Sequence, residues 1–244
     1  MTATPSPVPE VASEPAVAAP AARPVLRHRG LVRLTHWLNA VFLAGMIGSG
    51  LQIYTAYAHF GPHNAVFNLP NPFDASRLHI PGALRLGGWL GGGLRWHFVL
   101  AWPFVLTGAA YLLFLVVSGE WRALLFRPRD VKGSVEMLRY YLRLRPDHPP
   151  QGKHNPLQKS AYTFILLLAT ISILTGFAIA KPVQLGFLTT LFGGYQLARY
   201  WHFVAVWTFI AFIVVHVVMV FVADPASMRA ILTGRYKGRF PNHG

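Results

Sequence analysis

Long apolar runs, separated by polar or glycine- and proline-rich segments, dominate the chain from about residue 34 onward. Four runs are long enough to cross a bilayer, because a membrane-spanning helix needs about 20 mostly apolar residues. They cover about residues 34–54, 96–117, 161–180 and 200–222. The pattern therefore predicts an all-α fold, a transmembrane four-helix bundle, with the connecting segments at the two membrane surfaces.

The basic residues are distributed unevenly between the two sides of this bundle. The side that carries both chain ends holds 17 of the 22: Arg23, Arg27, Arg29, Arg33, Arg122, Arg127, Arg129, Lys132, Arg139, Arg143, Arg145, Lys153, Lys159, Arg229, Arg235, Lys237 and Arg239. The other side holds five: Arg77, Arg85, Arg95, Lys181 and Arg199. The positive-inside rule then places both termini in the cytoplasm.

Composition supports a membrane protein, since 53% of the residues are hydrophobic and only 12% are charged, whereas a soluble domain has about 25% charged residues. The formal net charge of +14 is a topology signal here. Binding of nucleic acid would need a basic face on a folded domain, and the pattern predicts no such domain.

The segments outside the spans differ in character. Residues 1–26 lack apolar periodicity, so we predict a disordered cytoplasmic tail before a membrane domain at 27–240. The periplasmic loop at 57–94 is rich in glycine, proline, asparagine and aromatic residues. Because long loops between packed helices are usually functional, we expect this one to cap the bundle and to dock a partner.

The cytoplasmic loop at 119–158 contains a candidate surface helix after Asp130. Its apolar stripe and its flanking basic residues are Val131, Val135, Leu138 and Leu142 with Lys132, Arg139 and Arg143. This pattern is typical of a helix that lies on anionic membrane lipids. A solvated basic loop is the alternative.

Histidine is the main candidate for chemistry, because the chain has no cysteine and therefore no thiolate ligands. His202 and His216 lie fourteen residues apart in one span. That spacing returns to within about 40° of the same helix face, about 21 Å further along the axis. One helix face thus carries two imidazoles at two depths in the membrane, where ionisable side chains usually mark a functional site.

The predicted topology places two further histidines at the same two depths in the membrane. His36 begins the first span on the cytoplasmic side, at the depth of His216, and His97 begins the second span on the outer side, at the depth of His202. A single histidine in a span is more often a packing residue, but two pairs of equal depth favour ligands. The other seven histidines are interpreted as non-ligands.

Two bis-histidine pairs are the ligand sets that two b haems need, and they leave no open position for oxygen activation. Zinc would need three or four ligands converging within about 2 Å, which two separated pairs do not supply. We therefore predict two haems b in the core of the bundle. Arg33, Arg95 and Arg199 lie two or three residues before His36, His97 and His202, and they either pair with haem propionates or are membrane-edge charges.

Glycines within the spans have two interpretations. Gly45, Gly48, Gly50, Gly108 and Gly176 would allow porphyrin to approach the backbone, or they would serve close helix packing. The sequence alone favours neither.

Several short motifs resemble a known family. They are Arg33-Leu-Thr-His36-Trp37, Arg95-Trp-His97-Phe98, Asn155-Pro-Leu-Gln-Lys159, Trp201-His202, Val215-His216 and Ile231-Leu-Thr-Gly-Arg-Tyr236. Over about residues 27–240 the chain resembles the four-helix di-haem cytochrome b superfamily, which includes bacterial cytochrome b(561) proteins and the b-type cytochrome subunits of nickel–iron hydrogenases and formate dehydrogenases.

The resemblance implies a membrane-anchoring subunit, rather than a complete enzyme, that passes electrons between the quinone pool and a periplasmic redox subunit. It implies the pairs His36–His216 and His97–His202. The partner would be of molybdopterin, hydrogenase-like or cytochrome c type, with the molybdopterin class most similar in its loops. Quinone would bind near the inner haem, with Asn39, Asn155 and Gln158 as candidates.

Two other classes of function remain open. A self-contained superoxide:quinone oxidoreductase would share the bundle but would leave the long outer loop without a role. A haem-free transporter or scaffold would make the matched histidine pairs a coincidence.

Overall fold

The computed structural model describes residues 25–26, 28–58, 60, 79–149, 154–223 and 225–236. The predicted tail, apart from Val25 and Leu26, lies outside the described residues, as does most of the first half of the outer loop. Within the described ranges, four long helices dominate the structure: α1 (Gly30–Ala56), α2 (Leu90–Ser118), α5 (Pro156–Ala180) and α7 (Tyr195–Ala223).

All four long helices are apolar enough and long enough to span a membrane, so the four predicted spans are confirmed. Each helix begins four to six residues before its predicted limit and ends within two residues of it. At 25 to 29 residues each, they are about 38–44 Å long, which covers the hydrocarbon core and reaches the headgroup region on both sides.

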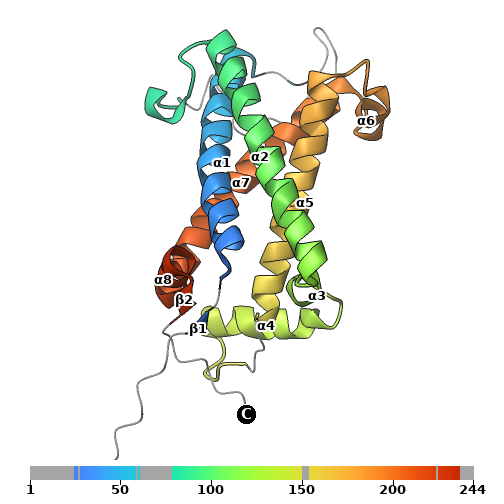
Figure 1. Ribbon diagram of the computed structural model, residues 1–244. Helices are drawn as coiled ribbons and strands as arrows, with labels where there is room; N and C mark the ends of the chain where they lie inside the picture. Colours follow the sequence, from blue (N-terminus) through green and yellow to red (C-terminus); the bar gives the residue numbers. More distant parts are fainter. Residues whose placement is uncertain are drawn as a thin grey trace, which may run out of the picture.

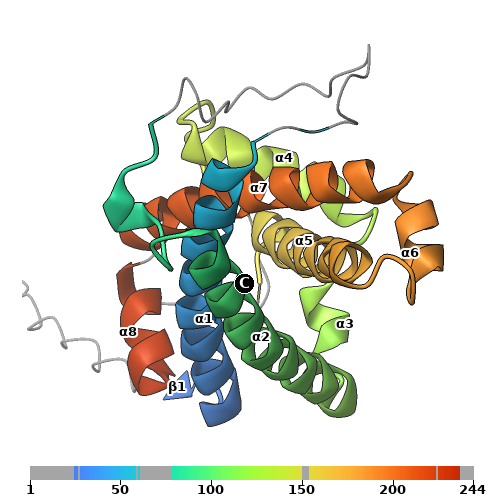
Figure 2. The ribbon, with the colours of Figure 1, turned by 90° about the horizontal axis from the view of Figure 1, so that it is seen from above.

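The spans are arranged as two antiparallel hairpins, α1 with α2 and α5 with α7 (Figure 1). Seen from above, α7 runs beside both α1 and α5 (Figure 2). At one end lie the short helices η1 (Gly82–Leu84) and α6 (Gly186–Leu191). At the other lie α3 (Trp121–Leu124), α4 (Asp130–Tyr141) and α8 (Pro225–Thr233).

The long helices bury few side chains against one another. In the most apolar 18-residue stretch of each helix, only 6–17% of the residues are buried. Lipid is an apolar solvent for the rest, which explains exposed residues such as Leu113 and Val117. One buried cluster lies at the end that carries η1 and α6, called the outer end here after the orientation predicted from charge, where Tyr54 and Phe60 pack against Phe203. The core therefore consists of separate contacts between helices.

The segment that connects α1 to α2 is held against α1 at Gly48. The backbone N–H of Leu86 donates to the carbonyl of Gly48 over 3.0 Å. A Cβ at Gly48 would lie 3.4 Å from the carbonyl oxygen of Leu84 and from Cβ of Leu86, so a side chain there would crowd the connection. The described part of this loop thus packs on the end of α1, and its role as a cap stays a prediction.

Two short strands at the opposite end add to the predicted all-α fold. β1 (Val25–Leu26) pairs antiparallel with β2 (Arg235–Tyr236), with Val25 opposite Tyr236. Residues 25 and 26 therefore belong to the folded domain, whereas the sequence pattern assigned them to the tail. Arg33 reinforces this end, because its guanidinium donates to the backbone carbonyls of Ile231 and Leu232 in α8.

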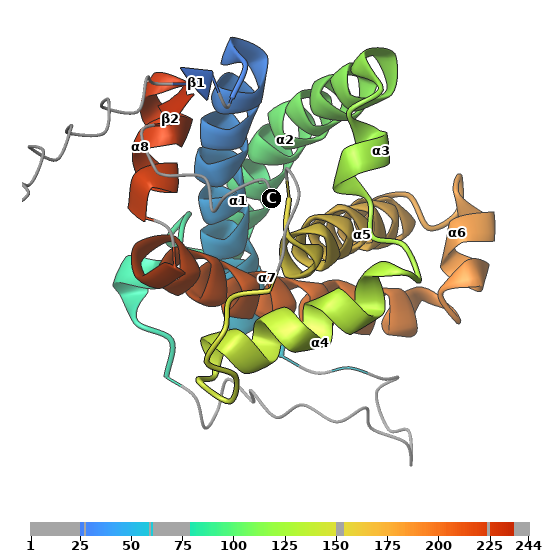
Figure 3. The same cartoon turned by 90° about the horizontal axis from the view of Figure 1, so that it is seen from below.

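The predicted surface helix is present as α4, which lies across the end of the bundle (Figure 3). Met137 is buried, while the stripe formed by Val131, Val135, Leu138 and Leu142 is 45–60% exposed. At about 100° per residue, this stripe lies more than a third of a turn from the buried Met137. The helix therefore has an unburied apolar side beside the bundle, as a position at the lipid surface requires.

An ion pair attaches α4 to α5. Asp130 is buried, and its Oδ1 lies 3.1 Å from Nζ of Lys159 while its Oδ2 accepts from the backbone N–H of Arg127. Burial opposes ionisation of this carboxyl, but the Arg127 N–H and the Lys159 ammonium outweigh it, so the pKa of Asp130 is lowered. The carboxylate is therefore ionised at neutral pH.

Candidate metal centres

The structure brings the four histidines of the spans together as two pairs. His36 of α1 and His216 of α7 have ring centroids 6.3 Å apart, with 52° between the ring planes. His97 of α2 and His202 of α7 have ring centroids 6.0 Å apart, with 73° between the planes. These are the pairs expected from matched depths in the membrane, and α7 contributes one histidine to each.

Both distances fit two imidazoles on opposite sides of one metal ion. A metal–imidazole bond is about 2 Å long and the nitrogen lies about 1 Å from the ring centre, which gives about 6 Å between ring centres. Within the described residues, no group of three or more histidine, cysteine or acidic side chains converges on one point. The arrangement thus suits a planar metal cofactor with two axial ligands better than a tetrahedral zinc site.

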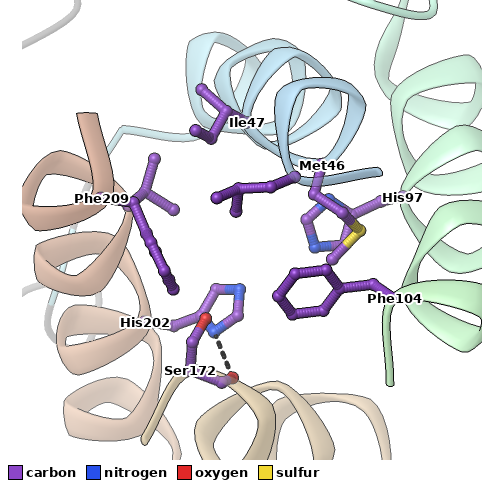
Figure 4. A pocket seen from close by; sticks show the side chains of 9 residues that line it. Met46, Ile47, His97, Phe104, Ser172, His202 and Phe209 are labelled. Atoms are coloured by element: carbon purple, nitrogen blue, oxygen red, sulfur yellow. Dashed lines mark hydrogen bonds between the residues drawn. The ribbon is translucent and has the colours of Figure 1, made fainter. Parts of the chain in front are cut away.

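A hydrogen bond defines which nitrogen of His202 is free. The backbone carbonyl of Ser172 lies 3.0 Å from Nδ1 of His202 (dashed in Figure 4). Because a carbonyl only accepts hydrogen bonds, Nδ1 carries the proton and Nε2 keeps its lone pair. This is the tautomer that a metal-ligating histidine needs.

The outer pair faces a pocket between the two hairpins. Figure 4 shows His97 and His202 on its lining, extending from different helices, with Met46, Phe104 and Phe209 among the apolar side chains around it. These walls hold no charged group, so they would shield a cofactor from water and leave the imidazoles as the polar ligands.

Two of the glycines singled out in the sequence lie beside the outer imidazoles. A Cβ at Gly50 would lie 3.7 Å from Cε1 of His97, and one at Gly176 would lie 3.4 Å from Cε1 of His202. Gly45 instead permits helix packing, because a Cβ there would lie 2.5 Å from Leu100 on α2. Gly50 and Gly176 thus leave room for the imidazoles and Gly45 permits close helix packing, whereas approach of porphyrin to the backbone stays a prediction.

The inner pair lies in a more open environment. His36 and His216 are both exposed. Trp37 packs edge-on to His36 at 5.2 Å between ring centroids, and Phe212 stacks on His216 at 6.0 Å. Aromatic side chains therefore orient these imidazoles.

The three arginines proposed to pair with propionates differ in their contacts. Arg33 donates to the carbonyls of α8, as described above. Arg199 donates to Gln196 over 2.8 Å and lies over the ring of Tyr57. Arg95 is exposed at the outer end of α2. Two of the three thus have a structural role in addition to any role toward a cofactor.

The quinone candidates also have structural contacts. Asn155 and Gln158 form a reciprocal capping box at the start of α5, with the Asn155 side chain accepting from the Gln158 N–H over 2.7 Å. Asn39 lies one turn from His36 on α1 and accepts from the Thr107 hydroxyl over 2.6 Å. Of the three, Asn39 is the one whose polar group lies within the span beside an inner histidine.

Two hydroxyl residues at the outer pair were missed by the sequence analysis. Ser49 Oγ lies 3.0 Å from Nδ1 of His97, and Thr175 Oγ1 lies 3.0 Å from Nδ1 of His202. The available signal was a hydroxyl residue directly before a glycine in the first helix of each hairpin, at Ser49-Gly50 and Thr175-Gly176.

Comparisons with known proteins identify a matching family and several similar sequences. A family model described as prokaryotic cytochrome b561 matches residues 27–234. A putative protein-methionine-sulfoxide reductase subunit YedZ1 of Azospira oryzae is 35% identical over 208 residues, covering 85% of this chain and 96% of that protein. Probable Ni/Fe-hydrogenase B-type cytochrome subunits of Cupriavidus necator and Bradyrhizobium diazoefficiens are 26% and 24% identical, each over 85% of this chain and over 83% and 82% of their own lengths.

Proposed function

The chain belongs to the prokaryotic cytochrome b561 family, and on that premise we propose that it holds two b haems and transfers electrons across a bacterial inner membrane between quinone and a periplasmic oxidoreductase. Family membership implies a b-type haem and electron transfer in the membrane. When bound, a b haem supplies a one-electron carrier. The number of haems, the quinone and the partner are the further steps of the proposal.

The observation that carries the proposal is the pair of matched imidazole–imidazole distances. His36–His216 and His97–His202 each fit one iron, and no further protein ligand is needed. A single haem would leave one of the two pairs inside the membrane without a role.

The orientation follows from charge. The described basic residues of α3, α4, α8 and the adjoining helix ends gather at one end of the bundle, which the positive-inside rule assigns to the cytoplasm. His97–His202 is then the periplasmic pair and His36–His216 the cytoplasmic pair. Electrons therefore enter and leave at opposite surfaces, with quinone near Asn39 at the inner pair.

The partner class is suggested by the relatives. The methionine-sulfoxide reductase subunit is more similar to this chain, at 35% identity over 96% of its length, than the hydrogenase subunits. We therefore propose a periplasmic oxidoreductase of the methionine-sulfoxide reductase type as the partner, ahead of a hydrogenase or a cytochrome c. It would dock on the outer loop, and the described part of that loop already packs on α1.

The experiment that tests this function is a haem count on purified protein by the pyridine haemochrome assay. Two b haems per chain are expected, and His97→Ala or His202→Ala should remove one of them while His36→Ala or His216→Ala removes the other. His148→Ala, in the polar segment before α5, is the matched control and should retain both. Retention of both haems in His202→Ala would contradict the ligand assignment, and a haem-free wild type would favour a transporter or scaffold.

The partner is tested separately by purifying the chain from membranes of its own source together with associated periplasmic proteins. Co-purification of a reductase that oxidises quinol only through this chain is the expected result. Superoxide-dependent quinone reduction by the isolated chain would instead favour the self-contained oxidoreductase.

A further inference from the structure

The hydroxyls of Ser49 and Thr175 occupy equivalent places in the two hairpins. Ser49 on α1 meets His97 on α2, and Thr175 on α5 meets His202 on α7, with 3.0 Å between oxygen and Nδ1 in each case. Both hydroxyl residues are 0% exposed. Two hairpins of different sequence thus present the same contact to the two histidines of one pair.

The direction of these hydrogen bonds follows from the other partners of each hydroxyl. Ser49 Oγ lies 2.8 Å from the carbonyl oxygen of Gly45, and Thr175 Oγ1 lies 2.7 Å from that of Ile171. A hydroxyl has one proton, and a carbonyl can only accept it. Each hydroxyl therefore donates one helical turn back and accepts from the imidazole, so that Nδ1 of each histidine carries the proton.

A backbone group three residues before each hydroxyl supports the same tautomer. The carbonyl of Ser172 accepts from His202 over 3.0 Å, and the backbone of Met46 accepts a hydrogen bond from His97. The single Nδ1 proton of each outer imidazole is thus shared between one carbonyl and one hydroxyl of the preceding span. The glycine after each hydroxyl residue leaves room for the ring, as the Cβ distances at Gly50 and Gly176 show.

We propose that Ser49 and Thr175 are positioning residues that hold both outer imidazoles with Nε2 toward the pocket and that lower the reduction potential of the centre bound there. The inference rests on the proposed ligation by His97 and His202. An acceptor on Nδ1–H makes the imidazole a more basic ligand, which favours the oxidised form of the metal. Within the described residues, no hydroxyl group hydrogen-bonds His36 or His216, so the effect is confined to the outer pair.

The test is a spectroscopic redox titration of the purified holoprotein carrying Ser49→Ala or Thr175→Val. Each variant removes one hydroxyl acceptor and leaves the backbone acceptor in place. We expect both haems to be retained and the midpoint potential of the same haem to shift upward in both variants. Thr175→Ser keeps the hydroxyl and should keep the wild-type potential.

A matched control is available on α5. Thr170 is exposed and its hydroxyl bonds the carbonyl of Leu166 over 2.8 Å, so Thr170→Val removes a hydroxyl of the same helix that does not touch an imidazole. It should leave both potentials unchanged.

Three outcomes would overturn the inference. In the first, Ser49→Ala and Thr175→Val both retain two haems with unshifted potentials. In the second, the two variants shift the potentials of different haems. In the third, Thr175→Val loses a haem and Thr175→Ser loses it too. Loss of the outer haem in Thr175→Val with full retention in Thr175→Ser would support it. A wild type without haem, by contrast, would refute the proposed function itself.

Discussion

Asp130 of α4 and Lys159 of α5 form a largely buried ion pair that joins the surface helix to the membrane bundle, with 3.1 Å between Oδ1 and Nζ. The carboxylate also accepts from the N–H of Arg127 in the turn before α4. One acidic residue therefore both stabilises this turn and attaches α4 to the third span, in a chain with only eight acidic residues.

Removal of this carboxylate should loosen α4. We expect Asp130→Asn to weaken its attachment on the order of 1–2 kcal/mol, because a charge-assisted hydrogen bond is lost and Lys159 stays partly buried without its anion. Hydrogen exchange of the α4 amides measures the change. Glu136→Gln is the control, since the Glu136–Arg145 pair is more exposed and should contribute little. Equal protection in Asp130→Asn and wild type would contradict this role.

The same ion pair gives a pH dependence with a defined sign. The pKa of Asp130 is lowered by Arg127 and Lys159 against the opposing effect of burial. A depressed carboxyl pKa stabilises the folded state fully above its unfolded value of about 3.9, and this stabilisation is lost as the pH falls through the folded pKa. Amide protection of α4 should therefore be constant from neutral pH to about pH 5 and should fall below about pH 4. Loss already between pH 7 and 5 would implicate other groups.

Arg33 offers a way to separate a structural role from a role toward a cofactor. Arg33→Ala removes the donors to the carbonyls of Ile231 and Leu232, so amides of residues 231–236 should exchange faster while both haems keep their potentials. Arg33→Lys should restore this protection only in part, because an ammonium does not reproduce the two-pronged guanidinium contact. A shifted haem potential with normal exchange would instead support propionate pairing.

The helix cap at Asn155 allows a similar separation. Asn155→Ala should destabilise the start of α5 by about 1 kcal/mol, because the Gln158 N–H loses its acceptor. Asn155→Asp keeps an acceptor and should behave as wild type in thermal unfolding and in quinone reduction. If Asn155→Asp unfolds normally but reduces quinone poorly, the side chain contacts quinone as the sequence analysis predicted.

Two glycines provide a graded steric test at the outer pair. A Cβ at Gly176 would lie 3.4 Å from His202, whereas one at Gly50 would lie 3.7 Å from His97. Gly176→Ala should therefore displace its imidazole by a few tenths of an ångström and alter the spectrum of one haem, while Gly50→Ala should be tolerated. The reduced-minus-oxidised absorption spectrum of each variant decides between them, and equal effects would argue against this packing.

The spans and the histidine pairs were predictable because they depend on length and depth alone. An apolar run of about 20 residues crosses the membrane once, so the order of the runs determines which end of each lies outside. His97 and His202 then share a depth whatever the packing angles are. The family resemblance pointed to the same pairs.

Local hydrogen bonding was not predictable in the same way. Ser49 and Thr175 look like any hydroxyl residue that bonds back to its own helix, and only the position of the neighbouring span aims the free lone pair at an imidazole. Asn155 and Gln158 were interpreted as quinone contacts, although their spacing is that of a capping box. The strands β1 and β2 pair because the two ends of the domain lie side by side. A contact between residues so far apart in the sequence cannot be predicted from a local sequence pattern.

Because α7 supplies a histidine to each pair, neither pair exists until this last of the four spans has left the ribosome and entered the bilayer. A chain halted after α5 would hold His36 and His97 but no second ligand for either. On the ligation proposed above, a complete ligand pair for either haem would form only after the whole membrane domain has been made, and a product truncated before α7 would lack both pairs.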